Sequence, residues 1–233
     1  WRERNPVIVP DGEGGAIIVF EQHAPPASEY AGDTDIGAQR INPQGKLLWN
    51  DGKKSSVVAS SKMPERNPVA VADGRGGVIV IFELSITSGE YKGDVDLFGQ
   101  RLDASGKMLW NEGRISSEVA TGSWSERRAQ AVADGQGGVI VAFEQHGPPG
   151  GKYEGDIDVA VQRVSAEGKR LWGEKGSLAV SEAEGYLERA PAVLADGAGG
   201  AWVVFEVEAR QGENRGDSEI AVQRVTPAGA LLW

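Results

Sequence analysis

One short turn sequence recurs four times along this chain, and its spacing constrains the fold more than any other feature. The pattern Asp-Gly-x-Gly-Gly begins at Asp11, Asp73, Asp134 and Asp196, in steps of 62, 61 and 62 residues. A fixed internal period is the signature of an array in which one supersecondary unit is repeated, as in a propeller or a solenoid. The chain is therefore predicted to be a repeat protein.

Each unit contains four strand-like runs separated by turn residues. In the second copy these runs are residues 68–72, 78–83, 96–102 and 115–120. Glycine after the Asp-Gly step supplies the positive φ angles that a tight hairpin requires. The run 78–83 is apolar on both faces, which is typical of a strand packed between two other layers. The pattern predicts a four-stranded antiparallel blade.

Two further dipeptides keep the same phase in every copy. A Gln-Arg pair ends the third run, and a Leu-Trp pair follows it about nine residues later. Large rings that recur once per unit are expected to fill the space between adjacent blades, because aromatic side chains bury the most area per residue. The residues assigned this structural role are Trp49, Trp110, Trp172 and Trp233.

The unit resembles the repeat of exported bacterial β-propeller proteins, through its DGxGG turn, its DxxxQR strand and its GxxLW close. This resemblance covers the whole chain. It implies an all-β propeller of four blades, each with four antiparallel strands, in an extracellular or cell-surface location. The alternative is half of an eight-bladed ring formed by two chains. The family has no single activity that could be carried over.

The repeat also predicts the domain organisation. We expect a single propeller domain over residues 1–233, with repeats 1–62, 63–123, 124–185 and 186–233. In the first three copies the last run follows the Leu-Trp pair, so the fourth repeat lacks its final strand in this sequence. An unpaired sheet edge invites pairing with another chain. Self-association through the fourth blade is therefore one expectation.

Composition excludes several classes of partner. The net charge is −10, and no run of Lys or Arg offsets it, so a nucleic acid is not expected to bind. The chain has no cysteine, which rules out disulfides and thiolate metal sites. No apolar run reaches the roughly 18 residues of a membrane-spanning helix, so no membrane span is expected.

The hairpin geometry gathers charged side chains at one edge of each blade. The start of the first run should lie beside the end of the second, which brings an arginine to a glutamate in every copy. The arginines are Arg4, Arg66, Arg127 and Arg189. We expect ion pairs that tie the strands together. The alternative is a calcium site, because surplus carboxylates are the oxygen ligands that Ca²⁺ prefers. The carboxylates concerned are Glu21, Asp33, Asp35, Glu83, Asp94, Asp96, Glu144, Asp156, Asp158, Glu206 and Asp217.

Two histidines lie in matching loops. The segments around His23 and His146 are near copies, 123 residues apart, whereas the second and fourth units carry other residues there. The simplest explanation is a loop inherited by duplication. The functional alternative is a pair of binding loops for a bivalent or two-fold symmetric partner, because binding residues concentrate on loops. The predicted ligand-binding residues are His23, Tyr30, Tyr91, His146 and Tyr153.

No catalytic residue can be assigned from the sequence. There is no G-x-S-x-G elbow, and the glycine-rich turns lack the Lys-Ser/Thr of a phosphate loop. The leading hypothesis is a non-enzymatic binding or scaffold propeller that recognises a protein or a glycan. The first alternative is a structural subunit that assembles by strand addition at the fourth blade. The second is a carbohydrate-active enzyme that uses the repeated carboxylates.

Overall fold

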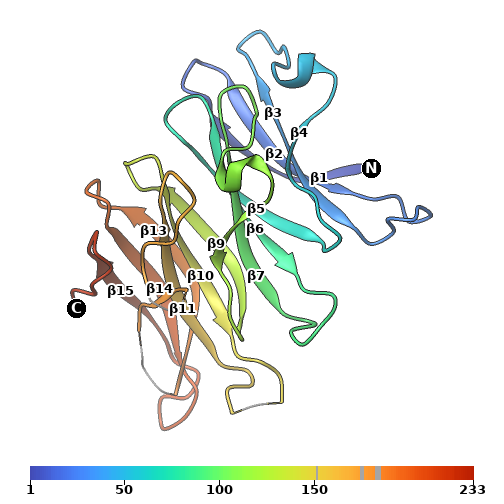
Figure 1. Ribbon diagram of the computed structural model, residues 1–233. Coiled ribbons are helices and arrows are strands. Elements are labelled where there is room, and N and C mark those ends of the chain that lie inside the picture. Colours follow the sequence, from blue (N-terminus) through green and yellow to red (C-terminus); the bar gives the residue numbers. More distant parts are fainter. Residues whose placement is uncertain (151, 174–175, 182–184) are drawn as a thin grey trace. The chain divides into compact units, whose positions relative to one another are not determined.

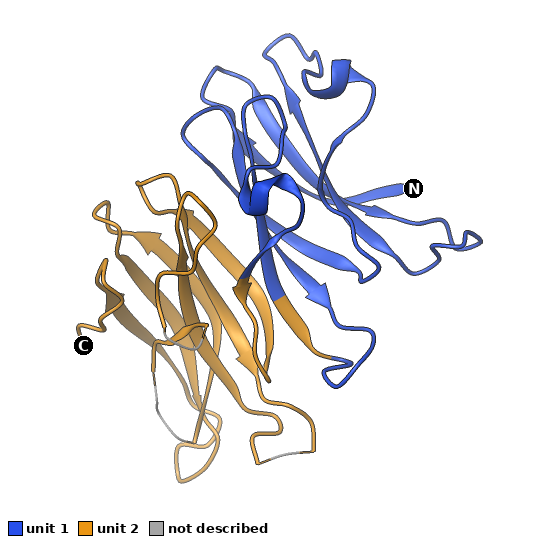
Figure 2. Ribbon diagram, in the orientation of Figure 1, with its two compact units in different colours: residues 1–93, 97–118 blue, residues 94–96, 119–233 orange. Residues whose placement is uncertain are grey.

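The computed structural model describes residues 1–150, 152–173, 176–181 and 185–233, and within them the fold is all-β. The chain divides into two compact units (Figure 2). Unit 1 holds residues 1–93 and 97–118, and unit 2 holds residues 94–96 and 119–233. Each unit is built mainly from two antiparallel sheets, which we call blades 1 and 2 in unit 1 and blades 3 and 4 in unit 2.

The strands follow the repeat in sequence order, and consecutive strands are neighbours within each sheet (Figure 1). Blade 1 contains β1 (Arg2–Pro10), β2 (Ala16–His23), β3 (Thr34–Ile41) and β4 (Ser56–Ala59). Blade 2 contains β5 (Glu65–Ala72), β6 (Val78–Ser85), β7 (Val95–Leu102) and β8 (Ser117–Ala120). Blade 3 contains β9 (Ser125–Ala133), β10 (Val139–His146), β11 (Ile157–Val164) and β12 (Leu178–Ala179). Blade 4 contains β13 (Tyr186–Ala195), β14 (Ala201–Ala209) and β15 (Ser218–Val225).

The predicted four-run unit is confirmed in blades 1 to 3, and blade 4 has three strands among the described residues. Strand β6 is buried at all of its first six positions, as its double-sided apolar sequence predicted. A short 3₁₀ helix lies before the outer strand in the first two blades, η1 (Trp49–Gly52) and η2 (Trp110–Gly113). Among the described residues no helix is long and apolar enough to cross a membrane.

The Asp-Gly turn and the Gln-Arg pair act together inside each blade. In blade 1, Asp11 Oδ1 accepts the backbone N–H groups of Glu13 and Gly15, both at 2.8 Å. Its other oxygen, Oδ2, accepts a hydrogen bond from Arg40 Nε at 2.9 Å. Both side chains are buried, and the same ion pair recurs in the other blades. One aspartate thus shapes the hairpin and holds the third strand against it.

The glutamine before that arginine bonds the third strand to the segment that leads to the fourth strand. Gln39 Oε1 accepts the backbone N–H of Trp49 at 2.9 Å, and its Nε2 donates to the carbonyl oxygens of Trp49 and Lys54. Gln100 and Gln162 make equivalent bonds in their own blades. Every polar atom of this buried amide is therefore used for structure.

Two of the four recurring tryptophans join neighbouring blades within a unit. Trp49 is 2 % exposed, and its indole Nε1 donates to the carbonyl of Ala104 in blade 2 at 2.9 Å. Trp172 is equally buried, and its Nε1 donates to the carbonyl of Pro227 in blade 4 at 3.1 Å. Trp233 differs, since it is 64 % exposed and lies with its ring centroid 5.1 Å from that of Trp202. No blade covers it, so it is not an interblade plug in this structure.

A bulge interrupts the first strand of each blade. The pairing of β1 with β2 shifts between Arg4 and Val7, and the other blades shift at the equivalent place. One residue there adopts the left-handed conformation that disfavours most side chains. These residues are Asn5, Asn67, Arg128 and Ala190, with φ values from 49° to 54°. The bulge redirects the side chains that precede it.

Candidate functional site

Each unit contains a histidine and a glutamate in direct contact at the end of a second strand. In unit 1, His23 Nε2 lies 2.7 Å from Glu21 Oε2. In unit 2, His146 Nε2 lies 2.8 Å from Glu144 Oε2. Both glutamates are 1 % exposed, whereas the imidazole side chains are 28 % and 30 % exposed. A buried carboxylate therefore holds a ring that solvent can reach.

The following blade supplies a backbone hydrogen bond to the glutamate of each pair. The backbone N–H of Asn67 donates to Glu21 Oε1 at 2.8 Å, and that of Ala190 donates to Glu144 Oε1 at 2.9 Å. Burial acts to raise the pKa of Glu21, but hydrogen bonds from Asn5, Asn67 and His23 outweigh it and hold the pKa below its ordinary value. These bonds favour the ionised form.

The same balance applies to the glutamate of unit 2. Burial acts to raise the pKa of Glu144, and hydrogen bonds from His146 and Ala190, with the charge of Arg128, bring it below its ordinary value. Both glutamates are therefore carboxylates that accept a proton-bearing Nε2, which fixes the tautomer and the orientation of each ring.

A pair of aromatic rings lies at the same end of each of these two sheets as the histidine. The rings of Trp1 and Tyr30 are 6.3 Å apart between centroids, and those of Trp124 and Tyr153 are 5.4 Å apart. Strand pairing sets Arg2 opposite His23 and Ser125 opposite His146, so each tryptophan is adjacent to the register position of its histidine. The tyrosines are about half exposed, at 53 % and 44 %. We call each set of Glu, His, Trp and Tyr an aromatic–histidine site.

The two sites differ in the residue that is paired with the histidine in the neighbouring strand. Thr34 is paired with His23, and its Oγ1 lies 3.4 Å from His23 Nδ1. Ile157 holds the equivalent position opposite His146 and offers no hydroxyl group. When Nε2 donates to the glutamate, Nδ1 carries the lone pair. Nδ1 is thus the ring nitrogen left to accept a hydrogen bond from a ligand, and the Trp–Tyr pair of the same sheet offers a surface on which a flat, partly apolar ligand can stack.

The sequence identified both histidines and Tyr30 and Tyr153, but it missed their tryptophan partners. Trp1 and Trp124 fall outside the loops, at the start of the first run, where no loop signal exists. Tyr91 is also exposed, at 56 %. In its blade, Met63 and Ser85 occupy the positions of the tryptophan and the histidine. Tyr91 is therefore not part of an aromatic–histidine site.

The predicted arginine–glutamate pairing is present in the register but not in the ion pairs expected from it. Arg4 lies opposite Glu21, and Arg189 lies opposite Glu206. Glu21 nevertheless takes its partners from His23 and Asn67, and Arg189 Nη1 pairs with Glu208 at 3.3 Å.

Blades 2 and 3 depart from that expectation as well. Arg66 faces Glu83, whose Oε2 accepts a hydrogen bond from Asn67 Nδ2 at 2.8 Å. Arg127 faces Glu144, which forms its ion pair with Arg128 at 3.5 Å. The bulge after each arginine accounts for the change, because it alters the direction of the side chains around it.

The predicted metal ligands differ in burial and fall into three groups. Glu83 and the two glutamates of the aromatic–histidine sites are buried, whereas Glu206 and Asp217 are exposed. The other aspartates are partly buried, and these are Asp33, Asp35, Asp94, Asp96, Asp156 and Asp158. In the part of the chain that the structure describes, no three His, Cys, Asp or Glu side chains form a group that could hold a metal ion.

The partly buried aspartates lie near a glutamate that the sequence analysis missed. Burial raises the pKa of Glu65 to about 7 and that of Glu126 to about 8, with smaller contributions from nearby aspartates. Burial likewise raises the pKa of Asp35 to about 6, with help from Asp33, and that of Asp158 to about 6, with help from Asp156 and Glu188. The signal was present, since a glutamate precedes the arginine in every copy.

Comparison with known proteins gives similarity in fold. No protein-family model matches the chain, and no curated protein matches it. Among solved structures, an ulvan lyase of polysaccharide lyase family PL25, bound to -[GlcA(1-4)Rha3S]-, matches 96 % of this chain with a TM-score of 0.59 and 12 % identity. An endo-arabinase from Bacteroides thetaiotaomicron VPI-5482 matches 100 % of it with a TM-score of 0.52 and 11 % identity. A thermostable family-43 glycoside hydrolase matches 99 % of it with a TM-score of 0.50 and 9 % identity.

These matches support an all-β, propeller-type fold. The chain spans 56 % of the ulvan lyase, 79 % of the endo-arabinase and 71 % of the family-43 enzyme. The expectation of a non-enzymatic binding or scaffold propeller is contradicted, because the solved structures that share the fold are polysaccharide lyases and glycoside hydrolases.

Proposed function

We propose that this chain processes glycans, and that the aromatic–histidine sites bind and cleave the polysaccharide. The observation that carries the proposal is the contact of His23 with Glu21, and of His146 with Glu144, in sheets that also carry a Trp–Tyr pair. Exposed aromatic rings offer a stacking surface for the apolar face of a sugar ring. An oriented imidazole is the side chain best suited to move a proton near neutral pH.

Each residue of a site has a separate role in this proposal. The buried glutamate keeps Nε2 protonated and stabilises the imidazolium that forms when Nδ1 accepts a proton. The tryptophan and the tyrosine position the sugar. Thr34 can hydrogen-bond to Nδ1 of His23 in the resting site, whereas His146 has Ile157 at that position. The two sites are thus expected to differ in activity.

The experiment measures products from a panel of polysaccharides that includes ulvan and arabinan. Reducing ends and unsaturated uronate are followed separately, because they distinguish hydrolysis from elimination. His23→Ala with His146→Ala should lower kcat by about a hundredfold or more, the usual contribution of general acid–base catalysis. Trp124→Ala should raise KM. Ser85→Ala is the matched control, since Ser85 holds the histidine position in blade 2.

Two results would contradict the proposal. If no polysaccharide in the panel is bound or cleaved, the chain is not a glycan-processing enzyme of this kind. If the double histidine variant keeps the parent kcat, the chemistry lies elsewhere on the chain.

We also propose that the four sheets are blades of one propeller, either as a ring of four in one chain or as half of a ring of eight formed by two chains. Support comes from the four-fold repeat and from the tryptophan contacts between blades inside each unit. The mass of the particle in solution distinguishes the two. The extracellular location stays a prediction from the sequence, and so does the calcium site that was given as the alternative to ion pairs.

A further inference from the structure

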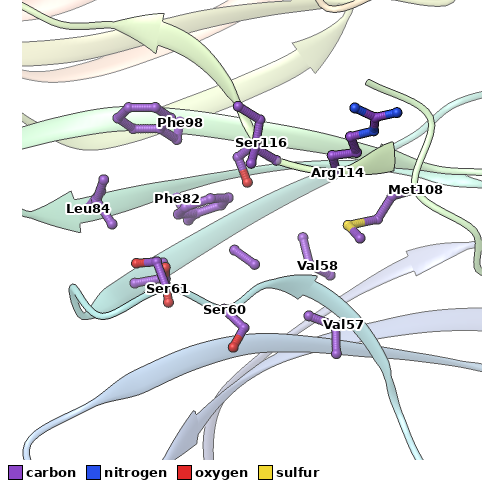
Figure 3. A pocket seen from close by; sticks show the side chains of 13 residues that line it. Val57, Val58, Ser60, Ser61, Phe82, Leu84, Phe98, Met108, Arg114 and Ser116 are labelled. Atoms are coloured by element: carbon purple, nitrogen blue, oxygen red, sulfur yellow. The ribbon is translucent and has the colours of Figure 1, made fainter. Parts of the chain in front are cut away.

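A cavity of about 250 Å³ lies between blades 1 and 2, within unit 1. One side is formed by the outer strand of blade 1 and the segment after it, and the other by blade 2 (Figure 3). Its lining is mostly apolar and includes Val57, Val58, Phe82, Leu84, Phe98 and Met108. An engineered cavity of about 150 Å³ with similar lining holds benzene, so this space is large enough for a small aromatic molecule.

One carboxyl group lines this cavity. Glu65 begins β5, lies opposite Leu84 in the strand pairing, and is 1 % exposed. Its Oε2 atom is buried and has no hydrogen-bond partner. A buried polar atom without a partner costs free energy, and native proteins satisfy nearly all of them. A ligand in the cavity with a hydrogen-bond donor would satisfy this oxygen atom.

The surroundings of Glu65 favour a donor that carries positive charge. Asp35 Oδ1 is also buried without a partner, and Asp33 and Asp35 act on Glu65 as neighbouring negative charges. The cationic side chain on the lining, Arg114, is 80 % exposed and pairs with Glu112 at 3.4 Å. The faces of aromatic rings also attract cations. Phe82 and Phe98 supply two such rings.

The repeat position does not leave its glutamate without a partner in every blade. Glu188 holds the same place in blade 4, and its Oε2 accepts the backbone N–H of Val159 at 3.0 Å. Glu126 in blade 3 has an unpartnered Oε2 as in blade 2, but its Oε1 accepts a bond from Gln145. The cavity and the open acceptor thus coincide at Glu65.

We propose that this cavity binds a small organic ammonium ion. Its N–H groups donate to Glu65 Oε2, and its apolar body packs against Phe82, Leu84 and Phe98. This site is separate from the aromatic–histidine sites and does not depend on the proposed glycan-processing activity.

Benzylammonium is the probe, and methionine methyl groups report its place. The chain has two methionines, Met63 and Met108, of which Met108 lines the cavity. With ¹³C-methyl methionine, an NMR titration should shift the Met108 signal to saturation and leave Met63 nearly unchanged. Benzyl alcohol has the same shape without the charge. It should bind at least about tenfold more weakly, the loss expected for one charged hydrogen bond.

Two variants test the role of the carboxylate and of the space. Glu65→Gln keeps the shape and removes the charge, so it should weaken benzylammonium binding at least about tenfold. Val57 lines the cavity and is 49 % exposed, so a larger side chain there can be accommodated by the fold. Val57→Trp should fill part of the cavity and abolish binding without removing a polar group. Glu3→Gln is the matched control, because Glu3 holds the same repeat position in blade 1.

Binding should also tighten between about pH 5 and about pH 8, as the raised pKa values of Asp35, about 6, and of Glu65, about 7, are passed and both groups become negatively charged. Arg114 stays charged throughout and does not contribute to this change. Three results would overturn the proposal: no response of Met108, equal affinity for benzyl alcohol, or unchanged affinity in Glu65→Gln. The last two would show an apolar cavity with no cation selectivity.

Discussion

The backbone N–H of Asn67 donates to Glu21 Oε1 at 2.8 Å, and this bond links the bulge of one blade to the histidine–glutamate pair of the blade before it. Unit 2 repeats the arrangement with Ala190 and Glu144 at 2.9 Å. The bulge residue must adopt a positive φ, which is 51° in both cases. A candidate catalytic pair is thus held in place by a strained backbone position in the neighbouring sheet.

Ala190 is expected to be a weak point of unit 2. Alanine in the left-handed conformation costs about 1–2 kcal/mol, and asparagine tolerates it better. Asn67 already fills the equivalent place in blade 2 and donates to Glu83. Ala190→Asn should raise the free energy of unfolding by about 1 kcal/mol, measured by urea denaturation. Asn67→Ala is the reciprocal control and should lower it by a similar amount. A destabilised Ala190→Asn would contradict this account.

The interblade tryptophans should dominate packing stability. Trp49→Ala removes a buried ring and the hydrogen bond to Ala104, so it should cost about 3–5 kcal/mol. Trp172→Ala should cost a similar amount. Trp233→Ala, at a residue that is 64 % exposed, should cost less than about 1 kcal/mol. Equal losses from Trp49→Ala and Trp233→Ala would show that the first ring is not an interblade plug.

The buried ion pair behind the hairpin turn should be sensitive to loss of one partner. Asp134 Oδ2 lies 2.9 Å from Arg163 Nη2, and both side chains are under 10 % exposed. Asp134→Asn leaves a buried guanidinium without its counter-charge, so we expect a loss of about 3 kcal/mol in unfolding experiments. Glu112→Gln breaks the exposed pair with Arg114 and should change stability by less than about 1 kcal/mol.

Glu126 should make the protein less stable as pH rises. Its pKa is about 8 in the folded protein, against an ordinary value of 4.5, so between these two pH values the folded state keeps a proton that the unfolded chain has lost. The free energy of unfolding therefore falls across this window. Glu126→Gln should remove that fall and stabilise the protein above about pH 8 by an amount of the order of 3 kcal/mol.

The measurement is urea unfolding at a series of pH values from about 5 to about 9. The exposed Glu213→Gln variant is the control and should keep the parent slope. If Glu126→Gln and the parent show the same pH dependence, the prediction is wrong. Glu126 would then be ionised in the folded protein despite its burial and the negative charges of Asp94 and Asp96.

The repeat made the blade predictable. Fixed phases of Asp-Gly and Gln-Arg identified the hairpin and the third strand, because each performs a task within the blade that recurs in every copy. The Leu-Trp phase identified the interblade ring at Trp49 and Trp172 but not at the exposed Trp233. The pairing of the aspartate with that arginine, as in Asp11 and Arg40, was not foreseen. Nothing in the spacing shows which of several arginines faces which carboxylate.

The candidate sites were predictable only in part, for a physical reason. His23 and His146 stood out as the two histidines of the chain. Their contact with glutamates two residues earlier follows from the period of two in a strand, which puts both side chains on one face. The backbone donors that the next blade supplies to those glutamates could not be foreseen from one sequence. Glu65 was missed because its burial results from the packing of two blades. Periodicity within one strand carries no information on that packing.

The glutamine of each blade finds all its partners close in sequence, as Gln39 does between residues 39 and 54. The indole N–H of Trp49, by contrast, can form its hydrogen bond only after Ala104 of the next blade has been synthesised. During synthesis a blade can therefore close on itself before the next one has left the ribosome, with a single indole still in water. Growth from the N-terminus would then advance one blade at a time, and the newest tryptophan marks where the following segment must dock.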